Sequence, residues 1–236
     1  MLIHDRAFLK DKPLQPSLDR ASRLALAGGQ KPFAAYVSCS DSRVPPELLF
    51  GRGLDELFIV PNAGNTLDVA AMGSPEFAVS VLGVPLIVVM GHEGCGAVST
   101  AMPVVDKGAR FPGNIGKMVE PIIPAVVEAA RFGHATLEGA VRQNVAHVVR
   151  ELREDSALTI IGAQTNGGLH VVGAYYALGT GEVDFSIPVL SRVHPISLNT
   201  SMRSHARMDR CQRPGRAGQF RGFHDQTEQS VPVQER

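Results

Sequence analysis

Two short polar segments of this 236-residue chain carry the side chains best suited to chemistry. The first holds Cys39, and the second holds His92 and Cys95. Two thiolates and an imidazole are ligands that zinc prefers, and three protein ligands leave one position open for water or substrate. The His-x-x-Cys spacing lets two side chains of one tight turn reach the same ion. We therefore predict a zinc site formed by Cys39, His92 and Cys95.

Two other interpretations of these residues are weaker. A buried cysteine is often only a small apolar side chain, and a single histidine is often a surface residue. Three such residues in two polar loops favour the metal site over that interpretation. The glycines of residues 91–96 (GHEGCG) also suggest a phosphate-binding turn, but they match neither the dinucleotide fingerprint nor the P-loop pattern. Nucleotide binding is therefore a minor alternative.

A carboxylate and a guanidinium lie shortly after the first cysteine in the sequence, on Asp41 and Arg43. A carboxylate so close to a metal can occupy the open coordination position or accept a hydrogen bond from water on the metal. The guanidinium can form a two-point pair with it, which lowers the pKa of the carboxylate and fixes its orientation. The alternative is a surface ion pair of little consequence.

The polar segments follow apolar runs that predict buried strands. We expect strands over 33–38 (FAAYVS), 56–60 (ELFIV) and 85–90 (PLIVVM), with helices over 47–50 and 75–82 between them. Apolar strands that alternate with helices are typical of a parallel sheet buried on both faces. The predicted fold class is therefore α/β, with a mainly parallel central sheet flanked by helices. In such sheets the functional loops lie at the carboxyl ends of the strands.

The second half of the chain mixes helices with a final hairpin. Apolar residues recur at helical spacing over 115–127, where Pro121 and Pro124 should divide the segment. A cleaner stripe predicts a helix; its members are Val141, Val145, Val148, Val149 and Leu152. We expect strands over 158–163 and 169–176, and a hairpin whose turn at 179–181 leads into 182–185.

Composition sets the domain organisation and excludes some partners. Apolar residues make up 44% of the chain, enough for one large α/β domain, which we assign to residues 1–196. Residues 201–236 contain seven arginines, no lysine and few aliphatic side chains, so we expect a disordered tail over 197–236. The 23 basic residues balance 23 acidic ones, which gives no reason to expect nucleic acid or a membrane as partner.

The cysteines and the first residues indicate the compartment. Three cysteines in a domain of this size fit a reducing compartment, and Cys211 in the predicted tail is left as a free thiol. The first twelve residues lack the apolar run of a signal peptide, and no apolar segment is long enough to cross a bilayer. We therefore predict a cytoplasmic protein.

Three motifs resemble the β-class carbonic anhydrases. They are residues 39–47 (CSDSRVPPE), 62–65 (NAGN) and 91–98 (GHEGCGAV), and the runs 172–176 (VGAYY) and 179–183 (GTGEV) resemble the closing hairpin of that family. The resemblance spans about residues 7 to 187. It implies reversible hydration of carbon dioxide to bicarbonate and a proton through zinc-bound hydroxide. It also implies a homodimer or homotetramer with the active site at a subunit interface.

Matched by position, the resemblance assigns roles to five residues. Cys39, His92 and Cys95 would ligate zinc, and Asp41 with Arg43 would form the catalytic pair. In family members with a closed site the aspartate becomes the fourth zinc ligand, so Asp41 could take either role. Hydrolysis of carbonyl sulfide or carbon disulfide on the same scaffold is one alternative function. A non-catalytic zinc protein is another, although a structural site normally has four ligands and needs no such pair.

The chain also departs from the family pattern. Many relatives carry arginine where this chain has Pro61. Relatives that bicarbonate inhibits at a second site use Trp, Arg and Tyr there, whereas the matching positions here are Tyr36, Pro61 and Phe77. We therefore expect this regulation to be absent. The chain begins where relatives still have a helical arm that embraces the partner subunit, which predicts either a weaker dimer or a misassigned start site.

Overall fold

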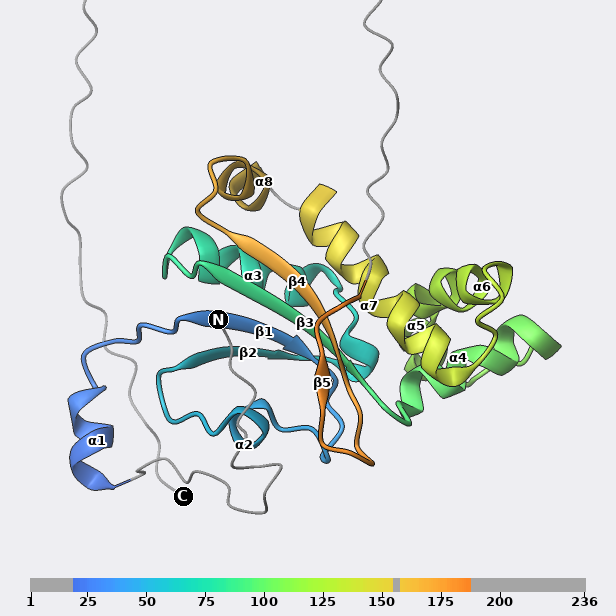
Figure 1. The fold of residues 1–236 in the computed structure, drawn as a ribbon, viewed down its shortest axis with the longest axis horizontal. Helices are drawn as coiled ribbons and strands as arrows, with labels where there is room; N and C mark the ends of the chain where they lie inside the picture. Colours follow the sequence, from blue (N-terminus) through green and yellow to red (C-terminus); the bar gives the residue numbers. More distant parts are fainter. Residues whose placement is uncertain (1–18, 155–157, 188–236) are drawn as a thin grey trace, which may run out of the picture. The chain divides into compact units, whose positions relative to one another are not determined.

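The computed structural model describes residues 19–154 and 158–187 (Figure 1). The predicted tail over 197–236, with Cys211, lies outside these residues. Among the described residues no helix is both long enough and apolar enough to cross a membrane.

A five-stranded sheet with the order β2-β1-β3-β4-β5 forms the centre of the fold (Figure 1). The strands are β1 (Ala34–Ser38), β2 (Leu57–Pro61), β3 (Leu86–His92), β4 (His170–Tyr176) and β5 (Val183–Asp184). The first four pair in parallel, and β5 pairs antiparallel with β4. The prediction of a mainly parallel α/β sheet that closes with a hairpin is confirmed.

Strand β1, which lies between β2 and β3, is buried along its whole length, as its apolar sequence predicts. The ring of Tyr36 on β1 meets Phe50 edge-on, with ring centroids 5.4 Å apart. Phe50 ends the short helix α2 (Pro46–Phe50), which begins at a proline and is followed by Gly51 in the left-handed conformation. Both the strand and the helix were predicted from sequence.

One helical layer covers a face of the sheet. Helix α3 (Val69–Ser80) packs on β1 and β2, while α7 (Leu137–Glu154) packs on β3 and β4. Helix α8 (Leu158–Thr165) contacts both of these helices. The valine stripe predicted for α7 is buried, as expected for the core-facing side of an amphipathic helix.

The remaining helices are α1 (Arg20–Ala25), α4 (Gly96–Lys107), α5 (Asn114–Val119) and α6 (Ile123–Arg131), with short 3₁₀ turns η2 (Ala63–Asn65) and η3 (Glu120–Ile122). Pro121 lies at the start of η3, and Pro124 lies at the start of α6. Proline fits the first turn of a helix because its missing N–H would have no partner there. The predicted division of this segment by its prolines is confirmed.

Two sequence-based predictions of secondary structure need correction. Residues 158–163 were expected to form a strand, but they lie in α8, because β4 already occupies the edge of β3 and a short apolar run does not distinguish strand from buried helix. Helix α3 begins at Val69, six residues before the predicted start at Pro75. Asp68 caps it by accepting a hydrogen bond from the N–H of Ala71, so Pro75 lies inside the helix.

Candidate metal centre

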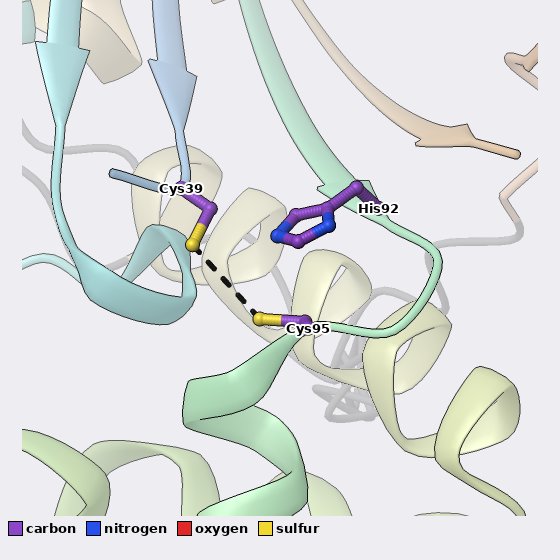
Figure 2. Close-up of side chains that lie close together, drawn as sticks. All are labelled: Cys39, His92 and Cys95. Carbon is purple, nitrogen blue, oxygen red and sulfur yellow. Dashed lines mark hydrogen bonds between the residues drawn. The ribbon is translucent and has the colours of Figure 1, made fainter. Parts of the chain in front are cut away.

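The carboxyl ends of two neighbouring strands bring the three predicted ligands together. Cys39 directly follows β1, His92 is the last residue of β3, and Cys95 lies just before α4. Strands β1 and β3 are parallel neighbours, so their carboxyl ends meet at the same edge of the sheet. Figure 2 shows the imidazole of His92 and the two sulfur atoms facing one another.

The geometry of these three side chains fits a zinc ion. The two Sγ atoms lie 3.9 Å apart, and the three ligand atoms all lie within 4.8 Å of one another. Two zinc–sulfur bonds of about 2.3 Å at a tetrahedral angle would place the sulfurs roughly 3.8 Å apart. Of the described residues, none gives the buried Nε2 of His92 a hydrogen-bond partner. Nδ1 lies 2.9 Å from the carbonyl oxygen of Glu93, so we assign it as the donor, which leaves the lone pair of Nε2 for a metal.

The two thiols share a hydrogen bond and titrate as a pair. That bond lowers the pKa of Cys39 and raises the pKa of Cys95, because the proton stays with one sulfur while the other carries the charge. Burial lowers the pKa of His92, but the nearby charge on the sulfur of Cys39 and the hydrogen bond to the carbonyl oxygen of Glu93 raise it, so the net shift is upward. The three side chains thus offer a negative charge on sulfur together with their other donor atoms, which suits a divalent cation.

Asp41 and Arg43 form the two-point pair that the sequence predicted. Arg43 Nε donates to Oδ1 of Asp41 at 2.9 Å, and Nη2 donates to Oδ2 at 2.7 Å. These hydrogen bonds hold the pKa of Asp41 well below its usual range. Oδ2 of Asp41 lies 3.9 Å from Nε2 of His92, so the carboxylate borders the three candidate ligands without belonging to their cluster.

Two glycines allow the backbone around the ligands to pack closely. Gly64 has a φ of 70°, and a Cβ on it would lie 2.7 Å from Cδ1 of Ile122. Its N–H donates to Sγ of Cys39 at 3.3 Å. Gly91 precedes His92, and a Cβ there would lie 2.6 Å from Cγ1 of Val141 on α7. Both positions therefore need the smallest residue.

Sequence reasoning missed three contributors to this site. Gly64 lies in the 62–65 motif, but the residue types of that motif do not reveal that its N–H donates to a sulfur. Glu93 accepts a hydrogen bond from Gly179 N–H at 2.9 Å and so links the His92 loop to the hairpin. Asn144 donates to the carbonyl oxygen of Gly64 at 2.8 Å. Asn144 alone had a signal in the sequence, as a polar residue on the apolar face of the helix between Val141 and Val148.

Comparison with protein families identifies the group to which this fold and site belong. A family model described as carbonic anhydrase matches residues 34–183, which include both loops with the candidate ligands. The chain belongs to the β-carbonic anhydrase family. The carbonic anhydrase 2 of Mycobacterium tuberculosis is 38% identical over 174 residues, which cover 74% of this chain and 84% of that protein. The carbonic anhydrase of Mycolicibacterium smegmatis is 37% identical over 75% of this chain and 85% of its own length.

Solved structures of β-carbonic anhydrases share the fold. One match comes from crystal structures of two tetrameric β-carbonic anhydrases of Sordaria macrospora. It has a TM-score of 0.61 at 27% identity and covers 70% of this chain and 85% of that chain. The β-carbonic anhydrase of Coccomyxa gives a TM-score of 0.61 at 27% identity, over 71% of this chain and 78% of its own. The family, the fold and the assignment as a carbonic anhydrase enzyme are thus confirmed.

Proposed function

We propose that this chain catalyses the reversible hydration of carbon dioxide at a zinc ion held by Sγ of Cys39, Nε2 of His92 and Sγ of Cys95. The observation that carries the proposal is the convergence of these three donor atoms within 4.8 Å, with the Asp41–Arg43 pair beside them. A structural zinc site would be expected to have four protein ligands and no such pair.

The metal would act as a Lewis acid that lowers the pKa of a water molecule to about 7. The surrounding residues orient the reactants. Oδ2 of Asp41 borders the ligand cluster, so it is placed to accept a hydrogen bond from the reacting water and to direct a lone pair of that water toward the carbon of carbon dioxide. Arg43 keeps this carboxylate ionised and fixes its orientation.

The hydrogen bonds of Asp41 support an open site over one in which Asp41 is the fourth ligand. Oδ1 accepts from both Nε and the backbone N–H of Arg43, and Oδ2 accepts from Nη2. Coordination by Oδ2 would compete with the bond to Nη2. We therefore propose that Asp41 acts on the water, and that the ligands are the two cysteines and the histidine.

We also propose a homo-oligomer that uses the outer side of α3. Val69 is 93% exposed, Val81 just after the helix is 64% exposed and Phe77 is 44% exposed. Large apolar side chains gathered on one helix favour a protein interface. The two β-carbonic anhydrases of Sordaria macrospora that share this fold are tetrameric. Sedimentation should show a dimer or tetramer, and Val69→Glu with Val81→Glu should shift it toward the monomer.

A cytoplasmic location agrees with the chemistry of the site. Cys39 and Cys95 are free thiols in the described part of the chain, and their role as ligands requires that they remain reduced. We therefore propose a reducing compartment for this enzyme.

The decisive experiment is stopped-flow hydration of carbon dioxide by the zinc-loaded protein. We expect activity that disappears on removal of zinc with a chelator and returns when zinc is added. Cys95→Ser should lower both the zinc content and the rate. An inactive wild type that binds one zinc would overturn the proposal. Assays with carbonyl sulfide and carbon disulfide on the same preparation would then distinguish hydrolysis from a non-catalytic zinc site.

A further inference from the structure

A buried amide lies behind the candidate metal centre. Asn144 is only 1% exposed and lies on the core-facing side of α7 among valine and alanine side chains. Burial of an amide in such surroundings is unfavourable unless it forms hydrogen bonds. An apolar side chain would fill this position at lower cost, so the contacts of the amide indicate why asparagine is present.

The amide of Asn144 reaches a metal ligand through one residue. Nδ2 donates to the carbonyl oxygen of Gly64 at 2.8 Å, across 80 positions of sequence. The N–H of the same glycine donates to Sγ of Cys39 at 3.3 Å. Gly64 is buried and has φ 70° and ψ 21°, a conformation open mainly to glycine. Asn144 on α7 holds the carbonyl group of Gly64. This contact fixes the backbone conformation in which the N–H of Gly64 points at Sγ of Cys39.

We propose that Asn144 is a positioning residue for the metal ligand Cys39, acting through the backbone of Gly64. The inference rests on the proposed function, in which Cys39 binds zinc. A hydrogen bond from an N–H group stabilises a thiolate and sets the direction of its remaining lone pairs. Residues that orient metal ligands in this way usually affect metal affinity about 10-fold to 100-fold.

Loss of the amide would disturb the site in a defined way. Without Nδ2, the buried carbonyl of Gly64 has no donor from α7, so the turn around Gly64 can rearrange to find another. Its N–H then no longer points at Sγ of Cys39. We expect weaker zinc binding and an altered bond from Sγ of Cys39, with His92 and Cys95 still in place.

Asn144→Leu tests this role, and Gln143→Leu is its matched control. Gln143 is the neighbouring residue on α7, and its amide donates to Oε2 of Glu128 at 2.7 Å, a contact with α6 that does not involve Gly64. Zinc affinity, measured by chelator competition, should fall at least about 10-fold in Asn144→Leu and stay near wild type in Gln143→Leu. In the cobalt-substituted proteins, only Asn144→Leu should shift the sulfur-to-cobalt charge-transfer band. Equal affinity and an unchanged band in Asn144→Leu would overturn the proposal.

A measurement on cadmium-substituted protein tests the proposal even if Asn144→Leu fails to fold. In wild type loaded with ¹¹³Cd, the amide proton of Gly64 should show scalar coupling to the metal through Sγ of Cys39. Asn144→Ser, whose side chain is too short to reach Gly64, should lose the coupling, while Gln143→Leu should keep it. Absence of the coupling in wild type, or its persistence in Asn144→Ser, would overturn the proposal.

One arm separates this inference from the proposed function. Wild type should bind one equivalent of zinc, and Cys39→Ser should not bind it with comparable affinity. If wild type fails to bind zinc, the proposed function is wrong. If it binds zinc while the Asn144 variants behave like wild type, only the role of Asn144 is wrong.

Discussion

Nη2 of Arg43 donates to the carbonyl oxygen of Gly94 at 3.1 Å while it also donates to Asp41. Gly94 lies between His92 and Cys95, so one guanidinium connects the loop after β1 with the loop after β3. Both loops carry candidate metal ligands. Arg43 therefore fixes the carboxylate relative to the whole ligand cluster.

Arg43→Lys should lower the rate of carbon dioxide hydration by about 10-fold or more, with zinc content unchanged. An ammonium group cannot make the two parallel hydrogen bonds to Asp41, so the carboxylate loses its fixed orientation. Stopped-flow assays with metal analysis would measure both quantities. Arg52→Lys is the control, because Arg52 pairs with Glu56 away from the site. A rate equal to that of wild type in Arg43→Lys would contradict this role.

Asp41→Asn should reduce kcat by about 100-fold or more. The amide is nearly the same size, but its NH₂ group cannot accept a hydrogen bond, and its oxygen carries no charge. Zinc binding should persist, since Asp41 lies outside the cluster of three ligand atoms. Loss of zinc in this variant would instead indicate that Asp41 is a ligand.

Glu93→Ala should speed zinc release several-fold. Its carboxylate holds Gly179 of the hairpin, and its backbone N–H donates to the carbonyl oxygen of Tyr176 at 2.8 Å. Loss of the carboxylate removes this side-chain link and leaves only backbone pairing between the His92 segment and β4 among the polar contacts described. Glu93→Gln keeps an acceptor oxygen and should restore slow release, as measured by transfer of zinc to a chromophoric chelator. Equal release rates in wild type and Glu93→Ala would refute the link.

Gly91→Ala should lower the free energy of unfolding by about 1–3 kcal/mol. The added methyl group would lie 2.6 Å from Val141 and 2.8 Å from Val145, so α7 would have to move away from β3. Gly96→Ala is a close control, because a Cβ at Gly96 meets nothing within 4 Å. Urea denaturation should separate the two variants, and similar midpoints would show that this close contact is unimportant.

Asp184→Asn should destabilise the protein at neutral pH but not near pH 2. Hydrogen bonds from Ser186 and then from Arg142 lower the pKa of Asp184 to about 2. Because the folded-state pKa lies below the usual value of about 4, the stabilisation is complete above pH 4 and is lost as the pH falls toward 2.

Asp184→Asn should lower the melting temperature at pH 7 by no more than about 2 °C, since the side chain of Asp184 is 40% exposed. Melting curves of wild type and variant should therefore converge as the pH falls. Glu138→Gln, which removes the charge of the second carboxylate paired with Arg142, provides the comparison. A difference that grows at low pH would contradict the assignment.

Local patterns along the chain are enough to predict several elements of the fold and the residue types that can bind metal. The valine stripe of α7 specifies a core-facing helix because burial follows its helical period, whereas the continuous apolar run of β1 indicates a segment buried on both faces. Cys39, His92 and Cys95 could be chosen as ligands because their donor atoms and their loops are visible in the sequence.

Other features depend on contacts between segments that are distant in the sequence. Residues 158–163 form part of α8 because the neighbouring position in the sheet is already occupied by β4. The hydrogen bond from Asn144 to Gly64 spans 80 positions, and the one from Gly179 to Glu93 spans 86. No local propensity encodes such pairs, since they exist only after the helices and the hairpin have packed against the sheet.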